Sequence, residues 1–578
     1  MRPRRLDLQK TDFIVRFAGE GGQGMVTSSE GLAQAASNVG YHVQTFVTFP
    51  SQIMGGPVMA QSRLATTPVL SSGDDIDVLV CFNEEGYQNH RGEVSDSGVV
   101  IYNSGDFEPE DLANSFGMPF ADLAKSTGNA RAENMIVLGA LAHLVSMKQG
   151  ILEDFVRERF TRGRPNDEQI ITSNIEALTL GRQEAEKSGF SLGELAPPIM
   201  PEGDQILLNG NEAISVGAVA AGLNFYIGYP ISPATSILLW MERNLTGDGK
   251  FVYQASSEIE AINAIVGAGY GGQKAMTATA GPGLSLMGEG IGLAWMAEVP
   301  LVVVDVQRGG PSTGLPTKTE QSDLLMALTP GHGDVSIPLV APGTVEECFY
   351  GAAMAINWAE RYQGPVILLS EHMLSERKQN IPKPDLSQLV VEERETYTGS
   401  NGYLRYDSWE LSPMPRPGGP GAYVANGSEH DSMGDTTHLP ERHIQMTERR
   451  FSKLKLLENE AYESRNTDAG IVLMPWGGSK GPAQSAYDEV VASGIDIGWY
   501  YTMFLNPLPA ELLEELRQKD LVLVPELNYL GQFSSVLRSQ GVNAESITQY
   551  TGLPFKVVDL ASRITARLEQ EQKVSVTV

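Results

Sequence analysis

The chain has 578 residues, which at roughly 100 to 200 residues per domain corresponds to several domains rather than one fold. Its composition is ordinary for a globular protein, with 42% hydrophobic and 20% charged residues, and no apolar run of about 18 residues predicts a membrane span. A formal net charge of −29 argues against nucleic acid as a partner, because it repels phosphate backbones. We expect a cytoplasmic protein, since no apolar secretory segment follows the basic residues at the start.

Cysteine and histidine are too sparse for a metal centre in this chain. Cys81 and Cys348 are the two cysteines, fewer than an iron–sulfur cluster or a four-cysteine zinc site needs. The eight histidines include no pair at the close spacing typical of zinc ligands. We therefore predict no metal site here and assign any redox metal to another chain.

The order of apolar runs and glycine turns predicts a multidomain α/β protein. In residues 1–192, strands and helices alternate, which predicts a mainly parallel, Rossmann-like sheet. Residues 203–382 form a second unit, with strands expected at 275–280, 301–306 and 366–369. Residues 383–466 lose this periodicity and form a connector with a charged, helical end, and residues 467–578 form a third α/β unit.

A glycine-rich turn lies near the start of the first unit. Gly19–Gly24 fits the G-x-G-x-x-G pattern between a strand and a helix, where free N–H groups favour an anion such as a pyrophosphate. An NAD site also needs an acid about 20 residues further on, and no Asp or Glu lies between Glu30 and Asp74. NAD is therefore disfavoured, and a turn without a ligand is the remaining alternative. A proline-rich linker at 197–201 is expected to let this domain swing.

Two further motifs lie in sequence contexts that do not support the functions they suggest. Gly477–Gly481 fits G-x-S-x-G, but that hydrolase fold needs a histidine after the serine, and the last histidine is His443. Gly247–Gly249 resembles the start of the GDG…N motif for Mg²⁺ and the diphosphate of thiamine diphosphate, yet a predicted strand and Asn263 follow too soon. We interpret the first as a strand-to-helix turn and the second as a surface hairpin turn.

Four polar loops follow predicted strands of the second unit. They are Tyr229–Thr235, Ala255–Glu260, Thr279–Gly283 and Val306–Gly314. Because ligands bind at the carboxyl ends of strands in a parallel sheet, we expect these loops to converge. The segments resemble the α subunit of 2-oxoacid:ferredoxin oxidoreductases, thiamine-dependent enzymes that oxidise 2-oxoacids with coenzyme A. The segment Gly19–Met25 resembles the γ subunit of that family, here fused ahead of α.

The resemblance implies both a fold and partners. The second unit would be a doubly wound sheet that binds the pyrimidine end of thiamine diphosphate, between a Rossmann-like γ domain and a C-terminal domain like the last domain of transketolases. Mg²⁺ and a [4Fe–4S] cluster would be held by a β subunit, without which the chain is inactive. A dimer of such heterodimers would pass electrons to ferredoxin, as in a step of the tricarboxylic acid cycle.

The resemblance also assigns roles to residues. Glu258 matches the glutamate that hydrogen-bonds the aminopyrimidine ring and favours the tautomer that removes the C2 proton; Glu260 competes with a poorer register. Arg308 matches an arginine against the substrate 1-carboxylate. Ser232 and Thr317 match residues of the substrate pocket, and Ser232 replaces a threonine that is frequent in the family. Pro230 matches the cofactor site. From position alone, Glu258 is equally well explained as an acid that complements the helix dipole, and Arg308 is better explained as a solvated loop arginine.

Substrate and coenzyme sites follow from the same resemblance. The fused γ–α order and the segment 311–323 resemble the 2-oxoglutarate branch, with Lys318 or a β-subunit lysine for the second carboxylate; pyruvate and branched-chain 2-oxoacids remain open. Gly21, Gly22, Gln23 and Gly24 are expected near coenzyme A. A noncatalytic subunit that binds coenzyme A and an NAD-linked dehydrogenase are the alternatives. The segment Glu526–Gln532 is expected to serve assembly, and His430 to be structural.

Overall fold

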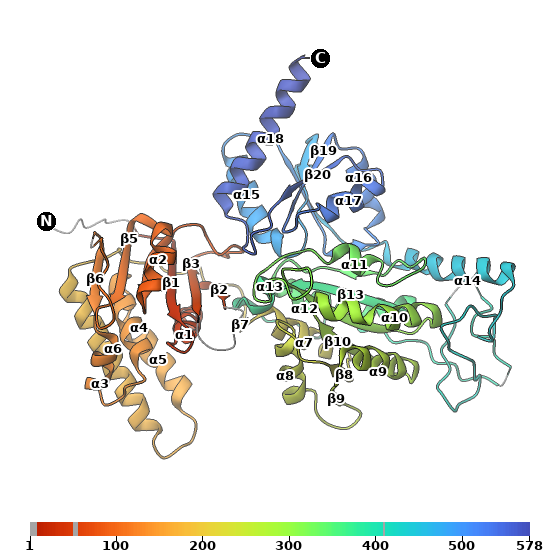
Figure 1. Cartoon of the computed structure of the whole chain (residues 1–578), viewed down its shortest axis with the longest axis horizontal. Coiled ribbons are helices and arrows are strands. Elements are labelled where there is room, and N and C mark those ends of the chain that lie inside the picture. Colours follow the sequence, from red (N-terminus) through yellow and green to blue (C-terminus); the bar gives the residue numbers. More distant parts are fainter. Residues whose placement is uncertain (1–8, 50–55, 112, 401, 409–410, 578) are drawn as a thin grey trace. The chain divides into compact units, whose positions relative to one another are not determined.

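A computed structural model describes residues 9–49, 56–111, 113–400, 402–408 and 411–577, with side chains described as far as residue 570. Its contacts divide the chain into two compact units, which are described separately (Figure 1). The first contains residues up to Leu208 together with Arg377–Lys383, and the second contains the remainder. None of the helices in the described part of the chain combines the length and apolar character that a membrane crossing needs.

The core of the first unit is an eight-stranded mixed sheet. Its strands lie in the order β6 (Ser115–Met118), β5 (Val94–Asn103), β4 (Ile76–Cys81), β1 (Asp12–Glu20), β3 (Pro57–Ala65), β2 (His42–Thr48), β14 (Gln379–Pro382) and β7 (Gln205–Leu208). The sequence predicts a mainly parallel sheet, but β3 runs antiparallel to both β1 and β2. Its central residues are polar yet buried, because Gln61 accepts a hydrogen bond from Arg16 Nε at 2.9 Å and Ser62 pairs with Ser29 at 2.7 Å.

Two differences concern the boundary of this unit. Strands β7 and β14, which the sequence analysis places in the second unit, pair with each other and extend the first sheet. The expected linker at 197–201 also belongs to the first unit, since Ile199 N donates to Thr66 O at 3.1 Å and Ala196 N to Lys10 O at 2.8 Å. These backbone pairs depend on partners far away in sequence, which local composition does not reveal.

Helices cover both faces of the first sheet. One core contains residues of α1 (Met25–Ser37), α3 (Phe120–Ser126), α4 (Glu133–Leu144), α5 (Gln149–Phe160) and α6 (Asp167–Ser188), whereas α2 (Glu84–His90) packs on the other face. Helices α4 and α6 cross at Gly139 and Gly181. A Cβ at either position would lie about 2 Å from a carbonyl oxygen of the other helix, 2.0 Å and 1.9 Å respectively. This close approach therefore requires glycine.

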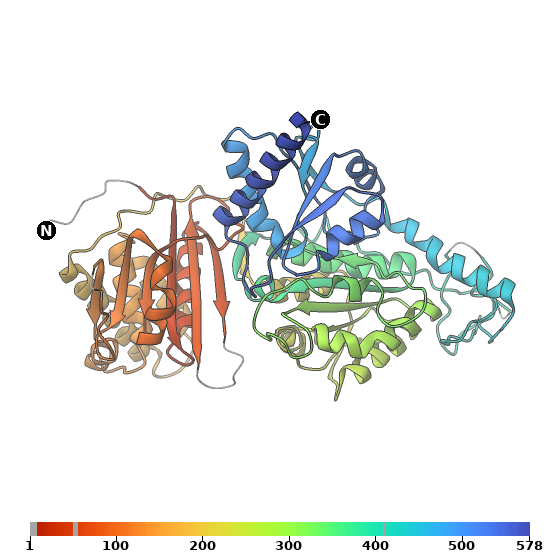
Figure 2. The same cartoon turned by 45° about the horizontal axis from the view of Figure 1, so that its top comes forward.

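The second unit contains a seven-stranded and a five-stranded sheet (Figure 2). The first has the order β18 (Phe504–Asn506), β12 (Leu339–Val340), β13 (Pro365–Glu371), β11 (Leu301–Gln307), β10 (Ala275–Thr279), β8 (Phe225–Gly228) and β9 (Phe251–Gln254). Its pairs are parallel except for β18, which runs antiparallel to β12. Its helices are α7 (Gly210–Ala220), α8 (Thr235–Asn244), α9 (Glu258–Tyr270), α10 (Gly281–Ala297), α11 (Leu324–Leu328), α12 (Val345–Tyr362) and α13 (His372–Glu376).

The five-stranded sheet lies in the C-terminal part. Its order is β15 (Glu463–Arg465), β17 (Gly498–Tyr501), β16 (Ile471–Leu473), β19 (Leu521–Glu526) and β20 (Ala544–Thr548). Helices α15 (Lys480–Ala492) and α18 (Val557–Thr577) share one core against it, and Figure 1 shows α16 (Ala510–Arg517) and α17 (Gln532–Ser539) on the other face. Only β15 is antiparallel to its neighbour.

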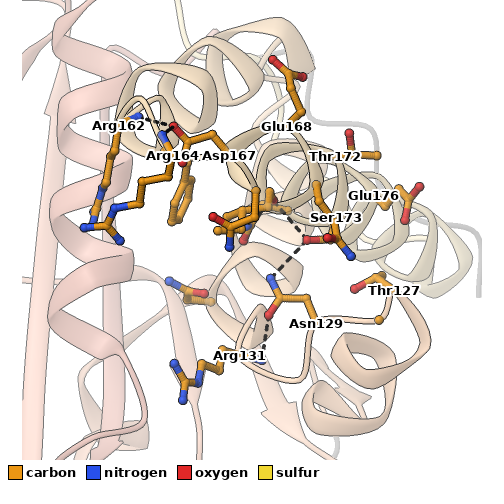
Figure 3. A pocket seen from close by; sticks show the side chains of 17 residues that line it. Thr127, Asn129, Arg131, Arg162, Arg164, Asp167, Glu168, Thr172, Ser173 and Glu176 are labelled. Carbon is orange, nitrogen blue, oxygen red and sulfur yellow. Dashed lines mark hydrogen bonds between the residues drawn. The ribbon is translucent and has the colours of Figure 1, made fainter.

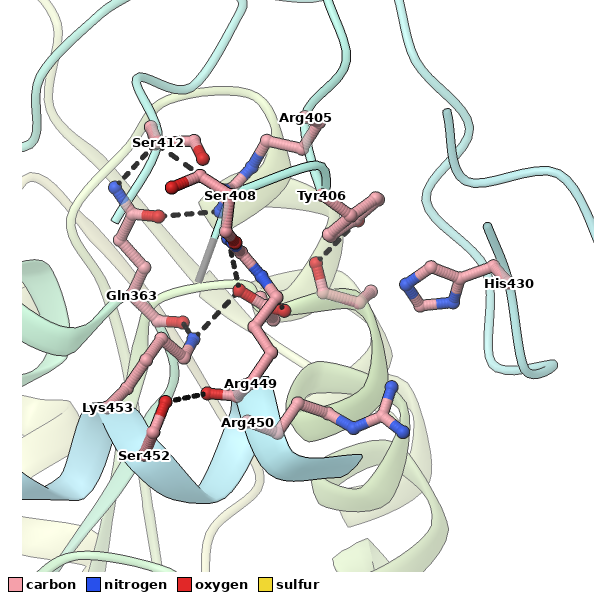
Figure 4. Close-up of polar contacts among 12 residues, drawn as sticks. Gln363, Arg405, Tyr406, Ser408, Ser412, His430, Arg449, Arg450, Ser452 and Lys453 are labelled. Carbon is pink, nitrogen blue, oxygen red and sulfur yellow. Dashed lines mark hydrogen bonds and ion pairs between the residues drawn. The ribbon is translucent and has the colours of Figure 1, made fainter. Parts of the chain in front are cut away.

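The connector is fixed to the second unit by a buried charged cluster, which we call the connector cluster: Glu298, Arg405, Arg449 and Lys453 (Figure 4). The Glu298 carboxylate, 0% exposed, accepts from Arg449 Nε at 2.9 Å and Lys453 Nζ at 3.0 Å. Arg405 Nη2 donates to Gln363 Oε1 at 2.6 Å. Arg449 belongs to the helix α14 (Pro440–Ser452), so the charged end of the connector is helical, as predicted. The charges of Arg449 and Lys453 are thus paired inside the protein rather than solvated.

Candidate functional site

The carboxyl ends of β8, β9, β10 and β11 carry the four polar loops of the second unit. Arg308 directly follows β11, and its Nη1 donates to the carbonyl oxygen of Ser232, after β8, at 2.6 Å. Pro230 lies in the same loop as Ser232, two residues earlier. The structure thus brings two of the expected substrate residues into direct contact at the edge where α/β sheets bind ligands.

Glu258 is the first residue of α9, and it is 6% exposed. Ser257 caps this helix by accepting from Glu260 N at 3.2 Å. The Glu260 carboxylate accepts from both the backbone N and the hydroxyl of Ser256 at 2.6 Å, which commits Glu260 to the helix start. The Glu258 carboxylate has no hydrogen bond to a residue that the structure describes. A buried carboxylate without donors is costly, which favours a donor from a ligand.

The loop after β10 leaves room for Glu258 only because residue 283 is glycine. A Cβ at Gly283 would lie 1.9 Å from Thr279 Oγ1, 2.8 Å from Glu258 Cγ and 2.9 Å from Glu258 Oε1. Any side chain there would therefore displace the glutamate or the threonine. The close fit holds Glu258 against the first turn of α10.

Arg308 is buried at 8% exposure, and its Nε has no hydrogen-bond partner. Burial lowers the pKa of Arg308, whereas the charge of nearby Asp323 raises it. Burial, followed by the charge of Glu320, raises the pKa of Asp323 to about 6 against the opposing effect of Arg308. Arg308 therefore keeps an N–H group for an acceptor that the described part of the protein does not supply.

Thr317 belongs to a loop that the C-terminal domain holds in place. Gln321 Nε2 donates to Trp476 O at 2.8 Å, and Gln321 Oε1 accepts from Leu527 N at 3.0 Å. The backbone N of Gln321 donates to Leu527 O at 2.8 Å, and its carbonyl accepts from Asn528 at 3.0 Å. The segment Glu526–Gln532, expected to serve assembly, thus binds the loop of its own chain that carries Thr317. The Thr317 side chain is not free either, since it has an interaction of its own.

Sequence reasoning missed His372, which lies at the same edge. It follows β13, and its neighbour Glu371 is the Cα partner of Gln307 in the adjacent parallel strand. His372 is 4% exposed, and burial, followed by the charges of Lys318 and Arg308, lowers its pKa to about 4. The rule that ligands bind at strand ends would have singled it out, because the strand at 366–369 was predicted.

The glycine turn of the first unit joins β1 to α1. Gly22 and Gly24 have φ of 100° and 92°, values that favour glycine. Gln23 Oε1 accepts from Glu20 N at 2.7 Å, and Gly21 N donates to Gly56 O at 3.4 Å, so both close the turn. Helix α1 has no side-chain cap and no acid in its first turn, which leaves its first N–H groups available. A Cβ at Gly22 would meet nothing within 4 Å.

A cavity of about 830 Å³ adjoins this turn (Figure 3). Asn134 lines it, and a Cβ at Gly24 would lie 3.7 Å from Asn134 Cβ. Arg131, Arg162 and Arg164 also line the cavity and lie on the left in Figure 3. Asp167 accepts from the backbone N of Arg162 at 2.6 Å and of Arg164 at 3.0 Å, which fixes the loop between α5 and α6. Three guanidinium groups therefore line a cavity that suits an anion, and one of its lining residues, Asn134, lies beside the glycine turn.

The remaining motifs have structural roles. Ser479 is buried, and its hydroxyl donates within 3.0 Å to carbonyl oxygens of Trp476 and Pro525, which does not suit a nucleophile. Gly247–Gly249 joins α8 to β9, so it is a helix-to-strand turn rather than a hairpin. His430 is buried against Tyr406, with ring centroids 4.4 Å apart, in keeping with a structural role. No metal-binding group of three His, Cys, Asp or Glu residues occurs within the described residues.

Family models match two parts of the chain. Residues 216–449 match the family described as "Pyruvate flavodoxin/ferredoxin oxidoreductase, thiamine diP-bdg", a thiamine diphosphate-binding domain. Residues 14–184 match the family described as "Pyruvate ferredoxin/flavodoxin oxidoreductase". The first match contains all four loops described above, and the second contains the glycine turn.

Relatives match the chain over nearly its whole length. "2-oxoglutarate oxidoreductase subunit KorA" of Mycobacterium tuberculosis is 32% identical over 96% of this chain and 91% of its own. "2-oxoglutarate synthase subunit KorA" of Methanocaldococcus jannaschii is 37% identical over 56% of this chain and 88% of its own.

A solved structure has the same fold throughout. It is the 2-oxoglutarate:ferredoxin oxidoreductase of Magnetococcus marinus with 2-oxoglutarate, coenzyme A and succinyl-CoA bound, at 35% identity and a TM-score of 0.91. It covers 96% of this chain and 100% of the solved chain. These similarities agree with the geometry of the four loops, and the chain belongs to the 2-oxoacid:ferredoxin oxidoreductase family as an α subunit with a γ-type domain at its N-terminal end.

Proposed function

We propose that the chain acts on 2-oxoglutarate and interconverts 2-oxoglutarate, coenzyme A and oxidised ferredoxin with succinyl-CoA, CO₂ and reduced ferredoxin. The observation that carries the catalytic part is the pairing, at one sheet edge, of a buried acid without donors, Glu258, and a buried guanidinium with an unused N–H, Arg308. Two relatives and a solved structure named for 2-oxoglutarate support the substrate.

The residues around Glu258 fit the aminopyrimidine end of thiamine diphosphate. A buried carboxylate that lacks a protein donor suits a ring N–H group, and Gly283 leaves space beside it. When bound, thiamine diphosphate supplies the carbon nucleophile that 2-oxoacid decarboxylation requires. The part of Glu258 is to hold the ring nitrogen in the protonation state that activates the cofactor. Pro230 lies in the loop of Ser232, whose carbonyl oxygen Arg308 contacts.

Arg308, Ser232 and Thr317 would then bind the substrate. The unused Nε of Arg308 is a charged donor in a buried site, and guanidinium groups pair well with carboxylates. Its Nη1 bond to Ser232 O sets the orientation of the guanidinium. Ser232 and Thr317 add hydroxyl groups, and Lys318 adds a charge for a second carboxylate.

We also propose that a β subunit completes the site and holds Mg²⁺, the diphosphate and a [4Fe–4S] cluster. Exposed apolar side chains support a partner surface here, since Leu315, Tyr529, Leu530 and Leu553 are 46%, 72%, 66% and 41% exposed. Gly552 lies against Lys318 and Leu315, so Leu315 and the adjacent Leu553 lie beside the substrate loop. A clustered apolar surface of this kind is typical of a protein interface. Assembly as a dimer of heterodimers is part of this proposal.

Glu258→Gln in the complex with its β subunit tests this function. It should retain assembly and lower kcat by a factor of about 10² to 10⁴, since a proton-transfer role is lost. Glu260→Gln is the matched control in the same helical turn, because its carboxylate is bonded by Ser256 at the helix start. Full activity of Glu258→Gln would favour a noncatalytic scaffold, and hydride transfer to NAD without ferredoxin would favour a dehydrogenase. Higher kcat/KM on pyruvate or a branched 2-oxoacid would overturn 2-oxoglutarate.

For coenzyme A we propose the glycine turn Gly21, Gly22, Gln23 and Gly24 and the adjoining cavity. Free N–H groups at the start of α1 and three arginines suit its phosphates. Gly22→Val should raise KM for coenzyme A and spare 2-oxoacid decarboxylation. Gly189→Val, at another positive-φ glycine with no neighbour within 4 Å, controls for backbone strain. An unchanged KM in a folded Gly22 variant would remove the turn from the site.

A further inference from the structure

We propose that His372 determines substrate specificity by binding, together with Lys318, the distal carboxylate of a dicarboxylic 2-oxoacid whose 1-carboxylate binds Arg308. The inference rests on the proposed function and adds to it a residue from outside the four loops. We call Arg308, Lys318 and His372 the open cluster. Three observations carry it: the placement of His372, the absence of acceptors around it, and the engagement of the neighbouring acids.

The topology places His372 beside Arg308. Strands β11 and β13 are parallel neighbours, and Gln307 and Glu371 are Cα partners at their last residues. Arg308 and His372 therefore leave the sheet next to each other at its carboxyl edge. Lys318 comes from the loop after β11, where Gly309 N donates to Lys318 O at 3.1 Å and holds the backbone of Lys318 close to that strand end.

Each of the three side chains keeps a basic or donating group that has no acceptor among the described residues. The His372 ring and Lys318 Nζ have no hydrogen bond to a described residue, and Arg308 Nε is buried without a partner. Burial alone lowers the pKa of Lys318, and burial followed by the charges of Lys318 and Arg308 lowers the pKa of His372. No acid counteracts either shift. His372 is therefore a neutral N–H donor beside two cations.

The acids in the neighbourhood do not pair with Lys318 or His372. The Glu371 carboxylate accepts from Met373 N at 2.8 Å, from Leu374 N at 3.1 Å and from the Thr319 hydroxyl. Asp323 and Glu320 lie on the Arg308 side, where the pKa of Asp323 is raised to about 6. Burial also raises the pKa of Glu320. The two carboxylates of an incoming dicarboxylic 2-oxoacid would satisfy all three donors.

This arrangement discriminates between substrates. A second carboxylate would pair with the Lys318 ammonium and accept the imidazole N–H. A 2-oxoacid with an apolar tail would instead leave both groups desolvated and unpaired, which a site built for hydrogen bonds penalises strongly. The neutral state of His372 matters, because a third positive charge beside Arg308 and Lys318 would be repelled.

The test uses the complete complex with its β subunit and three variants, His372→Leu, His372→Gln and Lys318→Met. The measurement is the ratio of kcat/KM on 2-oxoglutarate to kcat/KM on 2-oxobutyrate. His372→Leu should lower the ratio by about 10-fold to 100-fold, in the range of a lost hydrogen bond to a charged group. His372→Gln keeps a neutral N–H donor and should restore most of the ratio, while Lys318→Met should lower it at least as far as His372→Leu.

Inhibition by glutarate gives a second readout, which a merely structural role of His372 would not move. The inhibition constant for glutarate should rise in His372→Leu more than that for butyrate. If the wild type prefers 2-oxoglutarate but His372→Leu lowers both kcat/KM values equally, this inference fails and the proposed function stands. If the wild type prefers 2-oxobutyrate or pyruvate, the proposed substrate itself fails, and the inference with it.

Discussion

Two groups of buried charges in the second unit differ in how they are satisfied. In the connector cluster, the carboxylate of Glu298 lies among Arg405, Arg449 and Lys453 and accepts hydrogen bonds from two of them. In the open cluster, Arg308, Lys318 and His372 lie together without a bonded acid. Buried charges are costly unless they are paired. The first cluster therefore holds the fold together, whereas the second is balanced only when an anionic ligand is present.

The largest effect should come from opening the connector cluster. Glu298→Gln leaves three buried basic groups without their carboxylate, and the free energy of unfolding should fall by about 3 to 5 kcal/mol. Urea unfolding measures this. Glu514→Gln is the control, since its pair with Arg517 is exposed and should contribute at most about 1 kcal/mol. Equal losses in both variants would contradict the structural role of the connector cluster.

Lowering the pH should protonate His372 and so add a third positive charge to the open cluster. The pKa of His372 is lowered from 6.5 to about 4 in the folded chain, so the unfolded chain binds the proton first as the pH falls. The folded state should therefore lose up to about 3 kcal/mol between pH 6.5 and pH 4 through this residue. Unfolding curves of His372→Gln should lack this part of the loss. An identical pH dependence of both proteins would argue against the lowered pKa.

A substitution at Gly283, beside Glu258, tests whether catalysis depends on the position of Glu258. Gly283→Ala places a Cβ against Thr279 and Glu258, and the resulting shift should lower kcat of the complex by about 100-fold, as expected for a misplacement near 1 Å. Gly292→Ala is the matched control in the same helix, where a Cβ meets nothing within 4 Å. Steady-state kinetics decide, and undiminished kcat in a folded Gly283→Ala would show that Glu258 tolerates displacement.

The smallest effect is expected when two lysines, one from each cluster, are compared. Lys453→Met removes a partner of Glu298 and should destabilise the chain. Lys318→Met removes a half-buried charge without a bonded acid, so the free energy of unfolding should stay within about 1 kcal/mol of the wild type or rise. Thermal unfolding of both variants measures the difference. A loss from Lys318→Met as large as that from Lys453→Met would mean that the open cluster is also structural.

The sequence predicted those parts of the fold and site that depend on local pattern. Apolar runs gave β1, β4, β10, β11 and β19, and polar loops after them gave Arg308 and Ser232, which the structure brings into contact. The roles of Glu258, Arg308, Ser232, Thr317 and Pro230 came from family resemblance and remain predictions. The preference for Glu258 over Glu260 acquired a physical basis only with the bonds of Ser256.

The parts that were not predicted depend on distant partners. Strand β3 carries Gln61 and Ser62 into the middle of a sheet, which is favourable only because Arg16 and Ser29 pair with them. Strands β7 and β14 come from residues about 170 positions apart and find each other across the chain. His372 has no local signal beyond its place after a strand. Its environment comes from Lys318 and Arg308, which are distant in sequence.

The hydrogen bonds between Gln321 and the C-terminal domain have a consequence for biosynthesis. All four hydrogen-bonding groups of this residue, two on the backbone and two on the side chain, are paired with Trp476, Leu527 and Asn528. The loop that carries Thr317 and Lys318 therefore gains these bonds only after the ribosome has synthesised some 200 further residues. An unfinished chain contains every residue assigned to the substrate, yet it lacks the means to arrange them, so binding competence arises only near the end of translation.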